Sequence, residues 1–188
     1  MTVEIRRHRF SVHDYHCMAK EGILGEDDRI ELIEGEIVEM APIGSRHAAQ
    51  VSLLGTRLGQ KVVPDQCIIR IQSPVRLSPY SEPEPDIALV RAREDFYKVR
   101  HPSPDEVILL IEVADSSLAY DRDLKSGLYA RWGVGEYWLI DLNDTAVHVF
   151  RGPSVDGYAT HAVLRGSDLL TCIELPFLLL RVDEILIG

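Results

Sequence analysis

The chain has 188 residues, of which 46% are hydrophobic and 27% charged, and its formal net charge at pH 7 is −10. This composition is typical of a globular protein, and the length predicts a single domain over residues 1–188. The acidic excess is spread along the chain with no run of lysine or arginine. That distribution excludes the usual electrostatic footprint of a general nucleic-acid-binding protein.

The features that the sequence lacks predict the cellular location of the protein and the redox state of its cysteines. No apolar run approaches the roughly 20 residues that cross a bilayer, which predicts no membrane association. Residues 1–10 are charged and are not followed by the apolar core of a secretory signal, so a cytoplasmic protein is expected. The three cysteines are odd in number and widely spaced, which favours reduced thiols over a disulfide framework or a zinc site.

The first third of the chain predicts two helices separated by a hairpin. Ser11 and Asp14 have capping-box spacing, so a helix is expected to begin at Ser11 and to end near Gly22 and Gly25. Residues 29–34 and 36–40 alternate acidic and aliphatic side chains about a glycine, which is typical of a hairpin. Ser45 is predicted to cap the second helix, whose apolar stripe is Ala48, Val51, Leu54 and Leu58.

The rest of the chain is richer in strands. The nearly continuous apolar run at 106–113 predicts a strand that is buried on both faces. A helix is expected at 120–132, the polar segment 91–105 is compatible with a helix, and residues 169–188 predict a short strand or loop and a closing helix. Other strands are expected at 67–72, 74–77, 86–90, 136–142, 146–151 and 157–164. This order predicts an α/β or α+β fold with a mixed sheet flanked by helices.

Two carboxylates stand where a buried sheet would not normally admit them. Asp86 opens a strand after a proline, and Glu112 lies near the end of the most apolar strand. An unpaired carboxylate there would cost several kcal/mol, so each needs a partner or a cation. If their strands are neighbours, the pair would suit Mg²⁺, which takes one or two carboxylates with waters and phosphate oxygens. Alternatively, Asp86 caps a turn and Glu112 pairs with an arginine.

Lys125 is a third candidate, on the helix that follows the Glu112 strand. Asp121 lies one turn before it and Tyr129 one turn after it. A lysine beside a metal-bound water can stabilise developing charge or help to activate the nucleophile. For Lys125 to reach the site, Leu124 and Leu128 would have to pack on the sheet. The alternative is a solvated lysine paired with Asp121.

These residues carry a family resemblance. Pro85-Asp86, Glu112 and a following basic residue are similar to the signature of the PD-(D/E)XK nuclease superfamily. The wider pattern resembles the Uma-type restriction-endonuclease family over roughly residues 10–182. It comprises the strings 31–38 (ELIEGEIV), 40–42 (MAP), 84–87 (EPDI), 111–117 (IEVADSS) and 135–141 (GEYWLID), with His47, Asp121, Lys125 and Tyr129 between them.

The resemblance implies a restriction-endonuclease-like fold with a phosphodiesterase site that binds Mg²⁺ or Mn²⁺. Asp86 and Glu112 would be the metal ligands, and both would be catalytic together with Lys125. The lysine of the superfamily normally lies two residues after the glutamate, where this chain has Ala114, so the lysine would have migrated to Lys125.

Other polar residues are possible accessories. The resemblance aligns Glu31 with the site, and the alternative is a surface glutamate. Glu31 and Glu34 are expected to point to opposite faces of their strand, so at most one of them joins a common site. His47, near a helix N-terminus, could contact a phosphate or a water, or it could be solvated. Tyr129 is also an accessory candidate. His13 and His16 have metal-ligand spacing on a helix without an evident third ligand, and are interpreted as surface residues.

Three functions remain in view. The first is a Mg²⁺-dependent DNA endonuclease, and the second is a non-catalytic or partner-dependent module that keeps the fold. The third is a hydrolase of a small phosphodiester. Neither a phosphate-binding glycine motif nor a Gly-x-Ser-x-Gly elbow is present, so no nucleotide cofactor is expected. Cutting both strands of a duplex would favour a homodimer. The hairpin bearing Tyr137, Trp138 and Val149 is either part of that interface or core.

Overall fold

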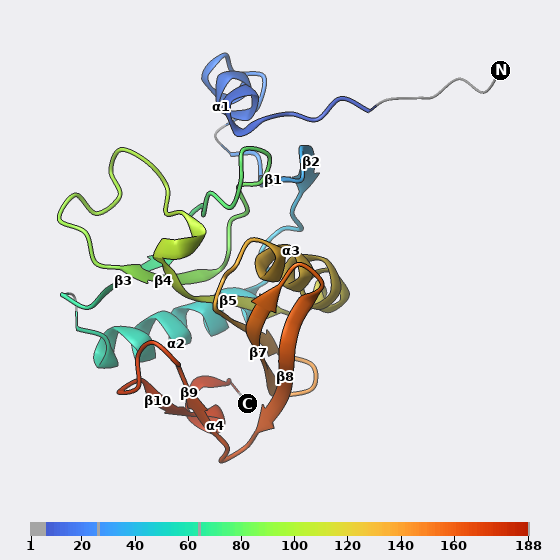
Figure 1. Ribbon diagram of the computed structural model, residues 1–188. Coiled ribbons are helices and arrows are strands. Elements are labelled where there is room, and N and C mark those ends of the chain that lie inside the picture. The colour runs from blue at the N-terminus through green and yellow to red at the C-terminus, as the bar shows by residue number, and fades with distance from the viewer. Residues whose placement is uncertain (1–6, 26, 64, 188) are drawn as a thin grey trace.

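The fold is built on a six-stranded sheet with the strand order β3-β4-β5-β6-β7-β8 (Figure 1). The computed structural model describes residues 7–25, 27–63 and 65–187. Strands β5 and β6 are parallel and the other neighbours are antiparallel, so the predicted mixed sheet is confirmed. The strands are β3 (Cys67–Ile71), β4 (Ile87–Arg91), β5 (Val107–Ala114), β6 (Glu136–Asp141), β7 (Ala146–Ser154) and β8 (Gly157–Arg165).

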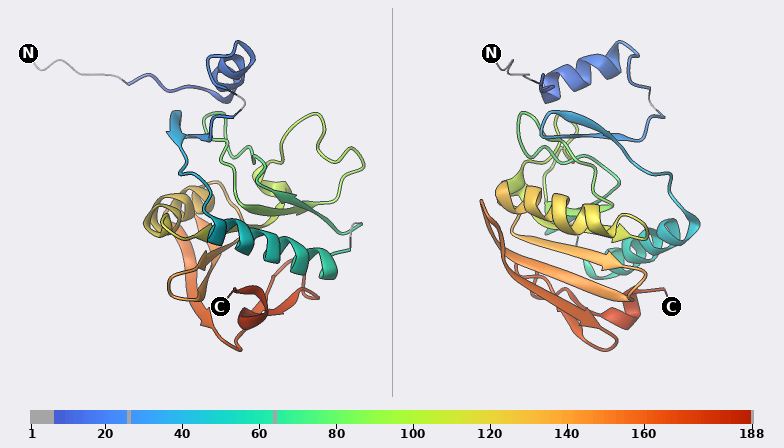
Figure 2. Two further views of the ribbon diagram at one scale, coloured as in Figure 1. Left: turned by 180° about the vertical axis from the view of Figure 1, so that it is seen from behind. Right: turned by 90° about the vertical axis from the view of Figure 1, so that its right-hand side faces the viewer.

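Helices cover both faces of this sheet (Figure 2). On one face, Val51, Leu54 and Leu58 of α2 (Ser45–Lys61) pack into a cluster with the sheet. On the other face, Leu128 and Tyr129 of α3 (Ser126–Arg131) pack into a second cluster. The first cluster also takes in α4 (Val182–Ile185) and the small hairpin of β9 (Leu169–Thr171) and β10 (Leu179–Arg181).

Strand β5 lies inside the sheet, with β4 and β6 as neighbours, and every one of its residues is buried, as its apolar run predicts. Successive side chains of a strand point to opposite faces. Leu109, Ile111 and Val113 face the α2 side, while Leu110 and Ala114 face the α3 side. Glu112 therefore points to the α3 side, which brings a carboxylate under the helical layer.

The N-terminal elements agree with the sequence patterns except at one cap. Helix α1 (Val12–Lys20) has the expected capping box between Ser11 and Asp14, and β1 (Ile30–Ile33) pairs with β2 (Glu36–Glu39). The prediction that Ser45 caps α2 is wrong. The cap is Gly44, in extended backbone, and Ser45 is already the first helical residue. Glycine is tolerated at this position because it adopts extended backbone readily and because the start of the helix is exposed, so that water can accept from the first N–H groups.

Three other expectations are corrected. Residues 74–77 form no strand, because the backbone N–H groups of Val75 and Leu77 donate to loop carbonyls at Pro83 and Ser81. The segment 91–105 is a loop of turns with one short 3₁₀ turn, η1 (Pro104–Glu106). The C-terminal region has two short strands rather than one.

The predicted helix at 120–132 begins with a π-helical segment, η2 (Tyr120–Lys125), before α3. The N–H of Ser126 donates to the carbonyl of Asp121, five residues back, so the turn is wider than in an α-helix. This changes which side chains face the sheet. Leu128 is buried as expected, but Leu124 is 44% exposed, so its predicted packing on the sheet is wrong.

The hairpin proposed for a dimer interface is core instead. Tyr137 and Trp138 on β6 are fully buried, and Val149 on β7 is 3% exposed, because both faces of the sheet are covered at this point. Across the described residues, none of the helices has the length and apolarity needed to cross a membrane.

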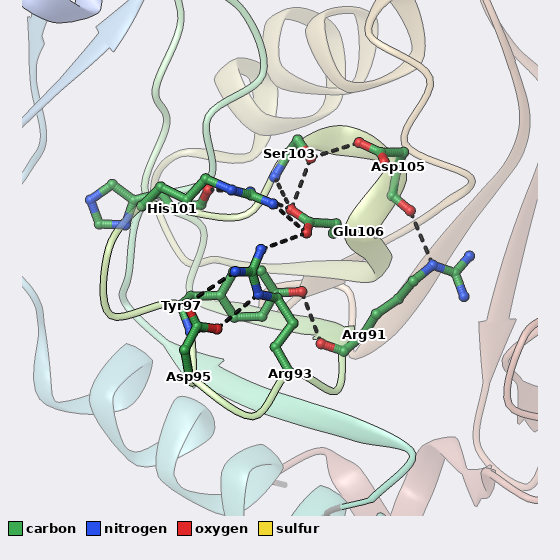
Figure 3. Close-up of polar contacts among 9 residues, drawn as sticks. Arg91, Arg93, Asp95, Tyr97, His101, Ser103, Asp105 and Glu106 are labelled. Carbon is green, nitrogen blue, oxygen red and sulfur yellow. Dashed lines mark hydrogen bonds and ion pairs between the residues drawn. The ribbon is translucent and has the colours of Figure 1, made fainter.

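The long loop between β4 and β5 is held by Glu106 (Figure 3). Its carboxylate accepts hydrogen bonds from both Arg93 and Arg100, and from the N–H of Ser103. Hydrogen bonds from Arg100, followed by those from Ser103 and Arg93, hold the pKa of Glu106 well below its ordinary value. The hydroxyl of Tyr97 donates to the Arg91 carbonyl and closes the base of the loop.

Glu106→Gln should lower the free energy of unfolding by about 2 kcal/mol at neutral pH, as expected for lost hydrogen bonds to charged groups. Because the folded-state pKa is depressed, the carboxylate contributes stability above pH 4.5, and that stability is lost as pH falls below it. Urea unfolding of both proteins at pH 7 and pH 3 measures this. Glu94→Gln, at an exposed position, is the control. If the difference in free energy of unfolding between Glu106→Gln and wild type were as large at pH 3 as at pH 7, the stabilising role of the Glu106 carboxylate would be contradicted.

Candidate active site

Asp86, directly before the start of β4, and Glu112, near the C-terminal end of β5, meet at the same end of the sheet. The antiparallel register pairs Ile87 with Ile111, so Asp86, one residue earlier, lies opposite Glu112. The N–H of Asp86 donates to Glu112 Oε2 at 3.1 Å, and the N–H of Val113 donates to Asp86 Oδ2 at 2.9 Å. Both carboxylates are buried. The two residues predicted from the sequence are therefore brought together by direct strand pairing.

Lys125 reaches the same point from the helical layer. Its ammonium donates to Glu112 Oε1 at 3.0 Å and lies 3.3 Å from Glu31 Oε2, and its side chain is 5% exposed. The solvated alternative is therefore wrong. Ala114, two residues after Glu112, is fully buried in the cluster under α3. The ammonium beside Glu112 therefore comes from the helical layer and not from β5.

Two of the accessory candidates support this arrangement. The hydroxyl of Tyr129 donates to Glu112 Oε1 at 2.6 Å. Glu31 is almost completely buried, so the alternative of a surface glutamate is wrong. Its oxygens accept from the hydroxyl of Tyr120 at 3.2 Å and from the N–H of Glu84 at 3.2 Å. Glu31 thus joins β1 to the helix that carries Lys125.

His47 approaches Asp86 from the first turn of α2. Its Nε2 lies 3.0 Å from Asp86 Oδ2, and its Nδ1 is buried without a hydrogen-bond partner within the described part of the chain. The hydrogen bond to Asp86 raises the pKa of His47, although burial opposes the shift. The imidazole is thus held at the carboxylate rather than solvated.

The other sequence candidates lie apart from this group. Glu34 is exposed and pairs with Arg131; it lies in the turn after β1 and not in the strand, so the expected alternation with Glu31 does not apply to it. His13 and His16 are exposed, which agrees with their interpretation as surface residues. Glu84 was not among the candidates, yet it lines the same cavity as Asp86. The signal was its spacing of two residues from Asp86, which in extended chain puts both side chains on one side.

A cavity of about 380 Å³ opens beside these residues. Its lining includes many more acids than bases. The bases are Arg29, His47 and Lys125; the acids are Glu31, Glu39, Glu84, Asp86, Glu112, Asp115 and Asp121.

Burial and mutual repulsion perturb these carboxyl groups. Burial raises the pKa of Glu112, and the charges of Asp86 and Asp121 add to the shift, which the Lys125 ammonium partly opposes. The pKa values of Asp121 and Glu84 are also raised, mainly by burial. Burial alone would lower the pKa of Lys125, but Glu112, Glu31 and Asp121 together raise it. The lysine therefore stays protonated, and several acids crowd around it.

This donor set fits a hard divalent cation. Clustered carboxylates whose ionisation is opposed by burial and by one another would be held ionised by such a cation. Residues 7–25, 27–63 and 65–187 contain no group of three histidine, cysteine or acidic side chains already arranged as metal ligands. Mg²⁺ does not need one, because it is bound through one or two carboxylates and keeps several waters.

Comparisons with known proteins place the chain in a family. Residues 12–181 match the model of Uma2, described as a putative restriction endonuclease. A comparison with curated proteins finds no match. A solved structure, a putative nuclease of the DUF820 group from Anabaena variabilis, is similar with a TM-score of 0.69 and 18% sequence identity. The alignment covers 94% of this chain and 97% of that one, and at this identity it shows a shared fold. Since the family model spans most of the sequence, this chain belongs to the Uma2 family of restriction-endonuclease-like proteins.

Proposed function

We propose that the protein is an endonuclease that hydrolyses DNA phosphodiester bonds with the help of Mg²⁺ or Mn²⁺. Asp86 and Glu112 would hold the ion, and Lys125 would complete the catalytic group. One observation carries the proposal: the buried ammonium of Lys125 lies 3.0 Å from Glu112, although the chain has Ala114 at the usual lysine position. The family match adds independent support.

Each side chain has a separate task in this proposal. A bound divalent ion would supply Lewis-acid stabilisation of the charge on the scissile phosphate. Lys125, kept protonated by its acidic neighbours, acts as a hydrogen-bond donor and electrostatic stabiliser rather than as a base. Tyr129 and Glu31 act as positioning residues, because each contacts Glu112 or Lys125 directly.

The test is nicking of supercoiled plasmid with and without Mg²⁺ or Mn²⁺. Wild type should nick only with the ion, and Asp86→Asn and Glu112→Gln should fall to the level of the EDTA control, because each removes a metal ligand. Asp156→Asn, on the exposed turn between β7 and β8, is the matched control and should keep full activity. Equal nicking by wild type and both ligand variants would refute the assignment.

The charge of the chain supports a second candidate, a module that keeps the fold and acts with a partner or without catalysis. A net charge of −10 weakens unaided binding to a polyanion at physiological salt. This candidate would be favoured if the protein alone did not nick plasmid at any ion concentration. A partner-dependent module would then gain activity when its partner is added, and a non-catalytic module would not. Hydrolysis of bis-(4-nitrophenyl) phosphate without plasmid nicking would favour a small phosphodiester as the substrate.

The proposed cleavage of both strands implies two sites, and we expect a homodimer with its interface outside the buried β6–β7 hairpin. Sedimentation at micromolar concentration tests this. A monomer over the whole range would contradict the dimer and would leave single-strand nicking as the activity.

A further inference from the structure

A second pocket lies outside the carboxylate site, between α1 and the β4–β5 loop. It has a volume of about 260 Å³, at the low end for small-molecule sites, which suits one planar group. We call it the second pocket. Its charged and imidazole side chains are His16, Arg76, Glu82, Lys98, Arg100 and His101.

The floor of this pocket is a buried carboxylate with one oxygen that accepts no hydrogen bond from the described residues. Glu82 is 3% exposed, and its Oε1 lies 2.5 Å from His16 Nε2. Its Oε2 is buried without a hydrogen-bond partner in the described part of the chain, and Arg76 Nε is 4.0 Å away. A buried acceptor without a hydrogen bond is costly, and the ion pair with Arg76 at 4.0 Å offsets only part of that cost, so this oxygen has capacity for a donor from a ligand.

The rim of the pocket has the opposite charge. Arg76 and Lys98 are exposed, against the single carboxylate at the floor, while the charge of the exposed Arg100 is matched by Glu106. This is a local excess of positive charge on a chain whose net charge is −10. A ligand that satisfies both parts must carry hydrogen-bond donors at one end and an anion at the other.

The wall that presents these groups is held in place. Arg100 forms two hydrogen bonds of 2.6 Å to Glu106, and the His101 ring lies on the far side of the loop from Glu106 (Figure 3). His101 is half-buried and stands edge-on to His16, with ring centroids 6.4 Å apart. Two imidazole rings therefore flank the pocket, and aromatic rings are suitable neighbours for a nucleobase.

We propose that the second pocket binds one nucleotide of a single-stranded nucleic acid. The exocyclic amino group of a cytosine, adenine or guanine donates to Glu82 Oε2, and the backbone phosphates contact Arg76 and Lys98. Thymine presents carbonyl oxygens beside its single ring N–H and is disfavoured. This inference deepens the proposed nuclease function and rests on it for the identity of the strand.

The test is fluorescence anisotropy in EDTA, so that no cleavage occurs. Labelled oligodeoxycytidine and oligodeoxythymidine of about twelve nucleotides, within the range of common site sizes, are the probes. Wild type should bind oligodeoxycytidine about tenfold more tightly, as expected for one hydrogen bond to a charged group. Glu82→Gln should reduce this preference, with a thermal melt as the check on folding.

A rim variant tests the phosphate contacts, and because Arg76 also faces Glu82 Oε2 at 4.0 Å, Lys98→Gln alone is measured beside the double variant. Arg76→Gln/Lys98→Gln should weaken both probes and reduce the slope of log K against log salt by about 1.4, or roughly 0.7 for each lost phosphate contact. Arg57→Gln/Lys61→Gln, on the exposed end of α2, is the matched control and should bind as wild type does.

Three results would overturn the inference: equal affinity for the two oligonucleotides, no effect of the rim variant, or equal affinity for free deoxycytidine monophosphate and the strand. The last would assign the pocket to a free nucleotide. Because binding is measured without metal, these outcomes are separate from failure of plasmid nicking, which concerns only the carboxylate site.

Discussion

Replacing Lys125 by methionine should lower the rate of plasmid nicking by roughly 10²–10³, the usual effect of removing one electrostatic stabiliser from an active site. Methionine keeps an unbranched stem in the buried channel and removes the ammonium that lies 3.0 Å from Glu112 and 3.3 Å from Glu31. Single-turnover cleavage at saturating Mg²⁺ measures the chemical step apart from ion binding.

The same variant should be less stable. Breaking a buried ion pair by removing one partner costs about 3–5 kcal/mol, because it leaves charge unpaired. Activity must therefore be measured below the melting temperature of the variant. Lys61→Met, on the exposed end of α2, is the matched control. Full activity of folded Lys125→Met would defeat the catalytic role and favour the non-catalytic module.

The sequence was sufficient for the sheet and for the carboxylate pair, because both depend on strand patterns. The apolar run at Val107–Ala114 allows only a strand buried on both faces, and the Pro85-Asp86 dipeptide marks where the neighbouring strand begins. Two strands that pair directly can bring their carboxylates together through register alone. The sequence left open whether the two strands are neighbours, and the register of β4 with β5 shows that they are.

The helical side of the site could be predicted less well. An ideal α-helix puts Leu124 and Leu128 on one face, whereas the π-helical segment leaves Leu124 exposed while Asp121 and Lys125 are buried. In this wider turn Lys125 is paired with Glu112 and Glu31, and Asp121 accepts a hydrogen bond from the hydroxyl of Ser117. Helical periodicity in a single sequence carries no signal for this choice.

The burial of Glu31 was left open for a related reason. Alternation along a strand does not say which face of the hairpin is covered, and Glu34 lies in the turn after β1. That face is covered by Tyr120 and by the proline-rich segment containing Glu84, both distant in sequence. Only the assembled fold shows that Glu31 and Lys125 belong to one group.

Mg²⁺ or Mn²⁺ should raise the melting temperature of wild type, because a ligand that binds only the native state stabilises it by mass action. At a free ion concentration one hundred times the dissociation constant, the gain is about 2.7 kcal/mol. For a chain of this length that corresponds to a shift of roughly 5–11 °C. Differential scanning fluorimetry across an ion titration measures it.

Asp86→Asn should lose this shift and yet melt at or above the wild-type temperature when no divalent ion is present. The carboxylate of Asp86 raises the pKa values of Glu84, Glu112 and Asp121, so its charge opposes the ionisation of its neighbours in the folded protein. Asparagine retains one oxygen to accept the N–H of Val113. Asp156→Asn should show the full metal shift. If Asp86→Asn and Glu112→Gln both keep it, the ion binds elsewhere, and the crowded carboxylates must be stabilised by Lys125 and His47 alone.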